Sequence, residues 1–468
     1  MASADDRPNI VLAIADDWGW PHASAYGDPV VKTPTFDRLA KEGVLFNHAY
    51  VSSPSCTPSR NAILTGQFHW RLGHGANLWS QLDPDTPVYP HLLKEAGYHI
   101  GSWRKSYGPG KLDGWSDHPA GQPGKGFEAF LKARPAGAPF CFWLGASDPH
   151  RGYKRDSGKD SGMDLSKIKL PACFPDSEMV RGDVADYYFE VQRFDRDVGN
   201  VVAKLEEMGE LDNTIILMTG DHGMPFPRCK GNLYDTGARV CLAARWGKRV
   251  KPEQVVDTFI STTDFAPTFL EAAGVKIPPQ MTGRSLVGLM TGGRTENRSF
   301  VLTGKERHTP CQEKGNGDGG GTPMRAIRNH QFLYIVNYEP SRWPAGTPNW
   351  RKAFVAGGWL GDCDNGPTKT YMVDYKDKDD IHRRLYELSF GKRPRQELYD
   401  LRNDPDQLVN VYNDPEYATV INELDEQLTV QLKNTKDPRV VGEGAQFDAY
   451  PYYGGIPKFP GVGKKKKK

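Results

Sequence analysis

Three short runs of apolar residues stand out in the hydrophobic pattern, and each of them ends in polar residues. They cover Asn9–Ala15, Phe140–Gly145 and Thr214–Thr219. Such runs predict parallel strands that are buried on both faces of a sheet. Because α/β sheets bind ligands beyond the carboxyl ends of their strands, the polar residues that follow these runs predict one shared site.

Amphipathic segments lie between the apolar runs. Apolar residues near a 3.6-residue period predict helices over Thr35–Glu42, Asp183–Met208 and Thr263–Ala273, and a glycine follows each segment. The alternation of strands and helices predicts an α/β fold in which helices cover both faces of a large mixed or parallel sheet.

The pattern changes near the glycine-rich stretch Gly315–Gly321, which predicts a loop or a domain boundary. Beyond it, Ala326–Tyr338 alternates as strands do and Pro415–Lys433 has a helical pattern, so we expect a smaller C-terminal α+β subdomain with a short antiparallel sheet. The expected organisation is a catalytic domain over 1–320, the subdomain over 321–449, and a mobile tail rich in Pro, Gly and Lys over 450–468.

Charge and hydropathy exclude two classes of protein. The 468 residues include 60 Lys and Arg against 58 Asp and Glu, a net charge of +2; without Lys464–Lys468 the value is 2 − 5 = −3. A nearly neutral body argues against nucleic-acid binding. No apolar run approaches the roughly 18 residues of a membrane span. Met1–Arg7 has no apolar core of a signal peptide, so either a leader is absent from this sequence or the protein is cytoplasmic.

The segment Ser55–Arg60 (SCTPSR), followed by Asn61–Gly66 (NAILTG), is the most informative motif. A lone cysteine here would usually be a buried residue at a helix start. The whole pattern, however, resembles the signature of type I sulfatases of the alkaline phosphatase superfamily, in which the cysteine is oxidised to formylglycine. The resemblance implies that Cys56 is the nucleophile after modification by a formylglycine-generating maturation system. A hydrated aldehyde can attack sulfur with one hydroxyl and later expel sulfate by re-forming its carbonyl.

Acidic residues follow two of the predicted strands, at Asp16, Asp17 and Asp221, with His222 next to the last of them. Any one of these aspartates could simply cap a following helix. Three carboxylates that converge would repel each other unless a cation neutralised them, and oxygen-rich ligation favours calcium or magnesium. The resemblance favours calcium, bound by these four residues together with position 56.

The resemblance also implies which groups bind sulfate. Lys105, Lys230 and Arg60 match cationic positions of the family, and His150 matches a histidine near the leaving oxygen, which we interpret as the general acid because imidazole titrates near neutral pH. One position departs from the family, since Tyr107 stands where relatives carry a histidine. A phenol can donate a hydrogen bond there but is a poor base at pH 7.

Further segments resemble bacterial carbohydrate sulfatases near heparan N-sulfatase, although each of their charged residues alone would more often form a surface ion pair. The candidate substrate contacts in them, besides Tyr107, are Arg307, His308, Arg325 and Arg342. The sequence thus predicts a calcium-dependent sulfatase that acts on a sulfated saccharide, in the periplasm or outside the cell, with the cytoplasm left open. Three alternatives remain: an N-sulfamidase, a phosphonate or phosphate-diester hydrolase, and an inactive glycan binder, which Tyr107 alone favours.

Overall fold

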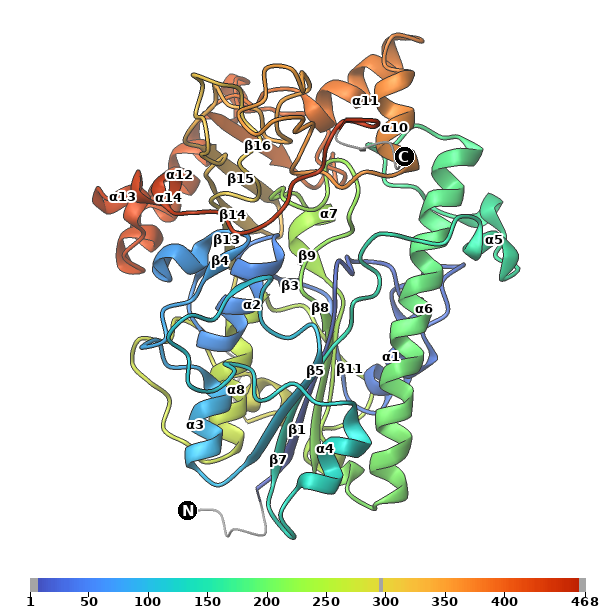
Figure 1. Ribbon diagram of the computed structural model, residues 1–468, viewed down its shortest axis with the longest axis vertical. Helices are drawn as coiled ribbons and strands as arrows, with labels where there is room; N and C mark the ends of the chain where they lie inside the picture. The colour runs from blue at the N-terminus through green and yellow to red at the C-terminus, as the bar shows by residue number, and fades with distance from the viewer. Residues whose placement is uncertain (1–6, 294–297, 463–468) are drawn as a thin grey trace, which may run out of the picture.

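The computed structural model describes residues 7–293 and 298–462, and a seven-stranded mixed sheet forms the centre of the larger part (Figure 1). The strand order is β11-β2-β10-β8-β1-β7-β5. Strands β1, β5, β7 and β8 run parallel, whereas β10 is antiparallel to both β8 and β2. The bounds are β1 Asn9–Ala15, β2 Val44–Phe46, β5 His99–Arg104, β7 Phe140–Gly145, β8 Thr214–Gly220, β10 Leu242–Arg245 and β11 Gln254–Val256.

Both faces of this sheet are covered by helices, as the buried apolar run of β1 requires. Val11 and Ala13 pack into the core beneath α6 (Glu178–Glu207) and α1 (Pro34–Lys41), while Leu12 points into a second core on the opposite face. This alternation is the two-residue period of a strand. On the second face lie α2 (Cys56–Thr65), α3 (Tyr89–Glu95) and α8 (Phe265–Ala272) (Figure 1).

A separate antiparallel sheet, in the order β13-β14-β15-β16, forms the smaller part. Helix α12 (Ala418–Asn434) covers it with Leu424, Leu428 and Leu432. The first strand, β13, precedes the glycine-rich stretch, so this sheet takes one strand from the segment that we assigned to the catalytic domain. Its strands are β13 Phe300–Lys305, β14 Met324–Asn329, β15 Phe332–Asn337 and β16 Gln396–Asp400.

The predicted α/β fold with a small antiparallel subdomain is confirmed, with small shifts at element ends. The largest is at α6, which begins at Glu178 because Ser177 caps it by accepting a hydrogen bond from the Val180 amide. The remaining α-helices are α4 Phe127–Ala133, α5 Ser157–Asp160, α7 Asp235–Ala238, α9 Val287–Thr291, α10 Pro367–Asp374, α11 Asp380–Phe390, α13 Pro438–Val441 and α14 Gln446–Ala449. The remaining strands are β3 Ala49–Tyr50, β4 Ser80–Gln81, β6 Gly110–Lys111, β9 Arg239–Val240 and β12 Ile260–Ser261.

We expected the tail to be a mobile end, and its described part makes backbone hydrogen bonds to both parts of the molecule. Residues 450–462 run from α14 across the junction between the two parts toward α10 (Figure 1). The lysine run lies outside the described residues. Within the described ranges, no helix is both long enough and apolar enough to cross a membrane.

Candidate active site

The parallel strands deliver their polar residues to one edge of the sheet. Asp16 follows β1, Asp221 follows β8, Lys105 follows β5, and His150 lies five residues beyond β7. Gly145, at the end of β7, permits this convergence, because a Cβ there would lie 1.6 Å from the Lys105 carbonyl oxygen. The sheet therefore brings charged groups from four separate segments to one place.

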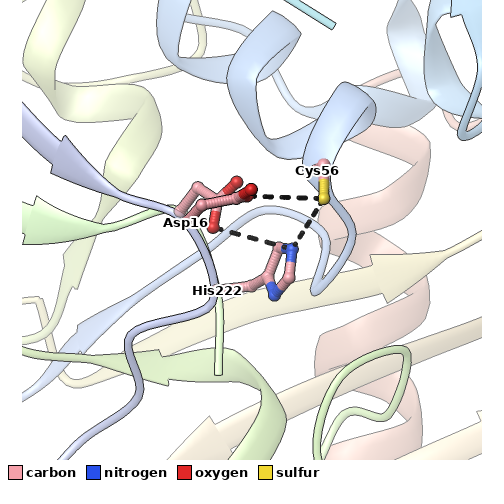
Figure 2. A group of neighbouring side chains, drawn as sticks. Asp16, Cys56 and His222 are labelled. Atoms are coloured by element: carbon pink, nitrogen blue, oxygen red, sulfur yellow. Dashed lines mark hydrogen bonds and ion pairs between the residues drawn. The ribbon is translucent and has the colours of Figure 1, made fainter. Parts of the chain in front are cut away.

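Cys56 is the first residue of α2 and points at the acidic edge of the sheet. Its Sγ lies 3.7 Å from Asp16 Oδ1 and 3.3 Å from His222 Nε2 (Figure 2). A hydrogen bond of 2.6 Å from Ser59 Oγ to the Asp221 carbonyl ties α2 to the end of β8. The cysteine of the motif and the acidic strand ends thus form one cluster.

The environment of Cys56 makes an unmodified thiol a poor nucleophile. Burial raises the pKa of Cys56 to about 12, although Lys105 and Lys230 act in the opposite direction. Because the thiolate is the reactive form of cysteine, very little of it would exist near pH 7. Position 56 is therefore buried beside two cations, yet nucleophilic attack by its thiolate is disfavoured.

The same cluster has the donor set of a metal site. Ligand atoms of Asp16, Cys56, Asp221 and His222 all lie within 4.8 Å of one another. The neighbouring Asp17 Oδ1 is buried without a hydrogen-bond partner, 3.3 Å from His222 Nε2. His222 Nδ1 lies 3.0 Å from the Gly223 carbonyl oxygen, to which it can donate, so its Nε2 lone pair faces these acceptors. Only a proton or a cation between them can stabilise such a group of acceptors.

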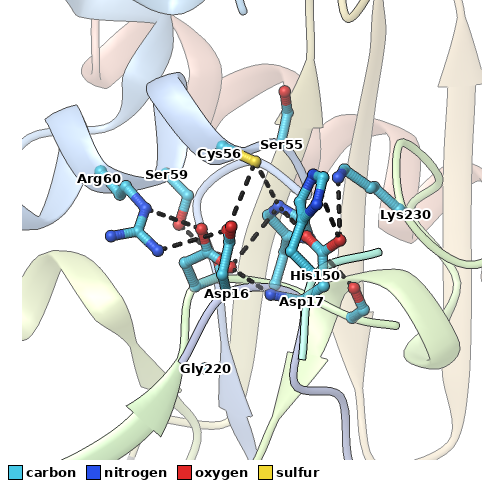
Figure 3. A network of polar contacts seen from close by, with 12 residues as sticks. Asp16, Asp17, Ser55, Cys56, Ser59, Arg60, His150, Gly220 and Lys230 are labelled. Carbon is cyan, nitrogen blue, oxygen red and sulfur yellow. Dashed lines mark hydrogen bonds and ion pairs between the residues drawn. The ribbon is translucent and has the colours of Figure 1, made fainter. Parts of the chain in front are cut away.

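Three cations, Lys105, Lys230 and Arg60, surround the carboxylates, and Figure 3 shows the latter two. Lys105 Nζ lies 2.5 Å from both oxygens of Asp16, and Lys230 Nζ lies 3.0 Å from Asp17 Oδ2. Burial alone would raise the pKa of Asp16, but these cations, with His150 and Arg60, hold it well below its usual range. Asp16 is therefore a carboxylate at neutral pH.

Arg60 has a different position from the two lysines. Its guanidinium is fully buried, donates to Asp221 Oδ2 at 2.8 Å and to the Lys105 carbonyl at 2.6 Å, and lies 3.4 Å from Asp16 Oδ1. Lys105 and Lys230 line the cavity above Cys56, whereas Arg60 does not. Arg60 orients the acidic groups from behind.

A cavity of about 530 Å³ opens above Cys56. His150 and His308 face it, as does Asp364, which lies 3.1 Å from Lys230 Nζ. His150 Nδ1 lies 2.5 Å from the Arg151 carbonyl oxygen, which leaves Nε2 free, 4.0 Å from Asp17 Oδ2. Burial lowers the pKa of His308 to about 3, so this imidazole is neutral. The cavity offers one partly exposed histidine beside two carboxylates and one neutral histidine.

With this geometry established, comparison with known proteins decides the family. A model of the family described as Sulfatase matches residues 8–275, more than half of the chain. The chain belongs to the sulfatase family. This membership confirms the resemblance noted in the motif around Cys56 and identifies a sulfuric-ester hydrolase.

Relatives of this sulfatase are known from distant organisms. An ulvan-active sulfatase of Formosa agariphila is 27% identical over 471 residues, covering 90% of this chain and 74% of the relative. The N-sulphoglucosamine sulphohydrolase of Homo sapiens is also 27% identical, covering 93% and 92% of the two chains. A protein solved in complex with its substrate D-glucosamine-2-N,6-O-disulfate superposes with a TM-score of 0.63 at 21% identity, covering 92% of this chain and 98% of that one, which shows a shared fold.

Tyr107 lies outside the cavity of this sulfatase. Its hydroxyl accepts from the Leu82 amide and donates to the Lys111 carbonyl, each at 3.0 Å, and burial raises its pKa to about 12. Tyr107 does not line the cavity above Cys56. The structure therefore gives this residue contacts within the loops around it, and none to the cluster at Cys56.

The three candidate arginines are also absent from the lining of that cavity. Arg325 is fully buried among Asp437, Glu306 and two backbone carbonyls. Arg307 donates to backbone carbonyls of the tail, and Arg342 pairs with Asp448 at 2.8 Å. These arginines therefore form structural ion pairs and backbone hydrogen bonds, which was the alternative to substrate binding. Of the candidates in these distal segments, His308 alone lines the cavity.

The sequence analysis missed several residues that line the cavity of the sulfatase. Asp364 lies in a loop that carries no recognisable motif, so there was no reason from the sequence to place it at the site. Glu190 lies within the long α6, where a single carboxylate usually faces solvent, and its neighbour Asp148 is in the segment that pointed to His150. Tyr452, which also lines the cavity, lies in the tail, where the Pro, Gly and Lys content predicted only a mobile end.

Proposed function

We propose that this sulfatase hydrolyses sulfate esters of a sulfated carbohydrate, with a formylglycine formed from Cys56 as its nucleophile. The observation that supports this proposal most is the juxtaposition of Cys56 Sγ with the acidic ends of β1 and β8 beneath the cavity. Relatives named for ulvan and for N-sulphoglucosamine support a saccharide as the substrate.

The oxidised form of position 56 supplies what the thiol lacks. In the hydrate of the aldehyde, one hydroxyl oxygen attacks sulfur and the ester oxygen leaves with a proton. The second hydroxyl then loses its proton, the carbonyl re-forms, and sulfate departs; addition of water restores the hydrate. The steps consume one water per ester, and the protein requires a maturation system as its partner during synthesis.

A calcium ion would be held by Asp16, Asp17, Asp221 and His222, beside position 56. Three carboxylates suit a hard divalent cation, and calcium accepts an irregular ligand set more readily than magnesium, which demands near-ideal octahedral geometry and retains water. When bound, the ion supplies positive charge next to the sulfate oxygens. The unpartnered Asp17 Oδ1 and the lone pair of His222 support this donor set.

Lys105 and Lys230 would bind the sulfate oxygens from two sides of Cys56. Burial alone would lower the pKa of Lys230, but Asp17 and Asp364 hold it well above its usual range, so the ammonium stays charged. Charge that is already oriented in a buried site stabilises the transition state without reorganisation. Arg60 acts as a positioning residue through Asp221 and Asp16.

His150 would protonate the leaving oxygen. Its Nε2 lies near the carboxylates of Asp17 and Asp364, and the side chain lines the cavity, within reach of a bound ester. Of the five candidates for substrate contact, we retain only His308, because it lines the cavity and Tyr107, Arg307, Arg325 and Arg342 do not. Sulfated polymers are extracellular, which favours a periplasmic or extracellular location.

An N-sulfamidase is the second candidate, because the human relative cleaves an N-sulphoglucosamine by its name and aligns over nearly the whole of both chains. The same nucleophile and cations would serve S–N cleavage. The identity of the scissile bond therefore decides between the two functions.

Two measurements test the proposal. Peptide mass spectrometry of protein co-expressed with a maturation enzyme should show the Cys56 peptide about 18 Da lighter than the thiol form, as expected for a carbonyl in place of a thiol. This protein should release sulfate, with calcium present, from glucosamine 6-O-sulfate or from ulvan oligosaccharides faster than from N-sulfoglucosamine or a phosphate diester. Preference for N-sulfoglucosamine would favour the sulfamidase, and a Cys56 peptide that remains a thiol under these conditions would contradict both.

A further inference from the structure

The C-terminal strap, defined as residues 450–459, forms one side of the cavity. It crosses the junction of the two parts of the molecule (Figure 1), and three of its residues, Tyr452, Gly455 and Pro457, line the cavity above Cys56. The strap belongs to the segment that we expected to be a mobile tail.

One anchor of the strap connects it to the helix that carries the nucleophile. The Tyr453 amide donates to the Trp79 carbonyl at 3.0 Å, and the Trp79 amide donates to Thr57 Oγ1 at 3.3 Å. Gly454 packs so closely on the Trp79 indole that a Cβ there would lie 2.2 Å from its Cγ. Thr57 follows Cys56 directly, so a short series of contacts links the strap to the catalytic position.

Further anchors hold both ends of the strap. Arg307 donates to the carbonyls of Tyr450 at 2.8 Å and Pro451 at 2.9 Å. At the other end, the Trp359 amide donates to the Pro457 carbonyl at 3.1 Å, next to the loop that carries Asp364. Arg307 thus holds the strap in place, which explains why it lies outside the cavity over Cys56.

Two adjacent tyrosines of the strap face opposite directions. Tyr452 lines the cavity and lies near enough to Cys56 and Lys230 for both to influence its hydroxyl, while burial raises its pKa. Tyr453 instead packs on the Lys111 ammonium, 4.2 Å from its ring centroid, and on His74. One aromatic ring therefore faces the space above the nucleophile, whereas the ring of its neighbour packs outside the cavity, and Tyr453 anchors the strap through its backbone amide.

We propose that the C-terminal strap is a wall of the substrate site and that Tyr452 is a specificity-determining residue, whose ring packs against the sugar that carries the sulfate. This inference rests on the proposed function. The lysines and acidic groups lie at the bottom of the cavity and recognise sulfate, whereas Tyr452 offers an aromatic surface beside them. Apolar C–H faces of sugar rings fit such a surface, and the hydroxyls of the sugar reach polar groups such as His308.

The test separates recognition of the sugar from recognition of sulfate. Protein made without the maturation enzyme, with calcium present, would be titrated with glucosamine N,6-O-disulfate and, separately, with inorganic sulfate. We expect Tyr452→Ala to weaken binding of the sugar about tenfold, which corresponds to about 1.4 kcal/mol, and to change sulfate affinity less than twofold. Tyr452→Phe should retain the affinity for the sugar.

Tyr453→Ala is the matched control, because it removes an equal ring from the same strap. It should leave both affinities within twofold, and thermal melts should show that all three variants are folded. Equal losses of sugar affinity in Tyr452→Ala and Tyr453→Ala, or no loss in either, would overturn the inference. If the unsubstituted protein binds the sugar but the matured form cleaves none of the sulfated substrates above, the proposed function fails while the inference about the wall stands.

Discussion

Two of the buried charge clusters in the described part of this sulfatase differ in how completely their charges are paired. One surrounds Cys56 at the carboxyl end of the central sheet. The other surrounds Arg325 in the smaller part, where Arg325 donates to Asp437 at 2.5 and 3.0 Å and to Glu306 at 2.6 Å. Arg439 donates to the other oxygen of Glu306 at 2.8 Å. Sequence analysis proposed residues of the first cluster as the active site and, from the second, Arg325 alone as a substrate contact.

The difference shows what separates a functional cluster from a structural one. Around Arg325 the carboxylates meet guanidinium groups in matched geometry, and Asp437 also accepts from the Arg439 amide at the start of α13. Around Cys56, by contrast, Asp17 Oδ1 has no partner, and the His222 Nε2 lone pair faces other acceptors. Unmet bonding capacity that opens into a cavity indicates a ligand, whereas a saturated network stabilises the fold.

The largest expected effect comes from Cys56→Ser in the first cluster. Serine is close to cysteine in size, so the protein should fold, but its alcohol cannot re-form a carbonyl to release sulfate. We expect turnover to fall at least about a thousandfold, or roughly 4 kcal/mol in the barrier. Steady-state sulfate release measures this loss, and circular dichroism checks the fold. Retention of activity would show that another residue is the nucleophile.

In the second cluster, Arg325→Ala should affect stability instead. It leaves the carboxylates of Asp437 and Glu306 buried with fewer partners, which costs about 3–5 kcal/mol. Chemical denaturation measures the free energy of unfolding. Arg402→Ala is the control, because Arg402 pairs with Asp400 but its side chain is 51% exposed, so its removal should cost less than about 1 kcal/mol. Similar losses in the two variants would contradict the structural role of the Arg325 cluster.

Asp221→Asn tests whether the unpartnered acceptor atoms around Cys56 bind a cation. It replaces a charged oxygen ligand with a neutral amide and also weakens the ion pair with Arg60. We expect calcium affinity, measured by isothermal titration in the unmatured protein, to fall about tenfold or more. Asp212→Asn, which alters an exposed partner of Arg245, should leave calcium affinity unchanged. Equal calcium binding by all three proteins would refute the proposed metal site.

The comparison also explains which parts could be predicted from sequence. β1 and β8 were readable because strands buried on both faces must be continuously apolar, and the topology of parallel strands then brings Asp16 and Asp221 together. Arg325 was not separable from a ligand-binding arginine, because its partner Asp437 lies 112 residues away and carries no motif. The place of the tail beside the cavity could not be predicted, because proline, glycine and lysine indicate only an irregular segment, and such a segment can still be held by Trp79 and Arg307.

The smallest expected effect concerns Glu190, a carboxyl in the wall of the cavity beside Asp148. Burial, and then the Asp148 charge, raises its pKa to about 7 from an ordinary 4.5. The folded state therefore binds this proton more tightly than the unfolded state, so stability is lost as pH rises from about 4.5 through 7. Between pH 5 and pH 8 we expect the free energy of unfolding of Glu190→Gln to fall by about 1 kcal/mol less than that of the unsubstituted protein, as measured by chemical denaturation. Glu207→Gln, at an exposed position of the same helix, should keep the loss seen in the unsubstituted protein. If Glu190→Gln loses as much stability between these pH values as Glu207→Gln does, Glu190 is already ionised in the folded protein at pH 5, and its pKa is not raised.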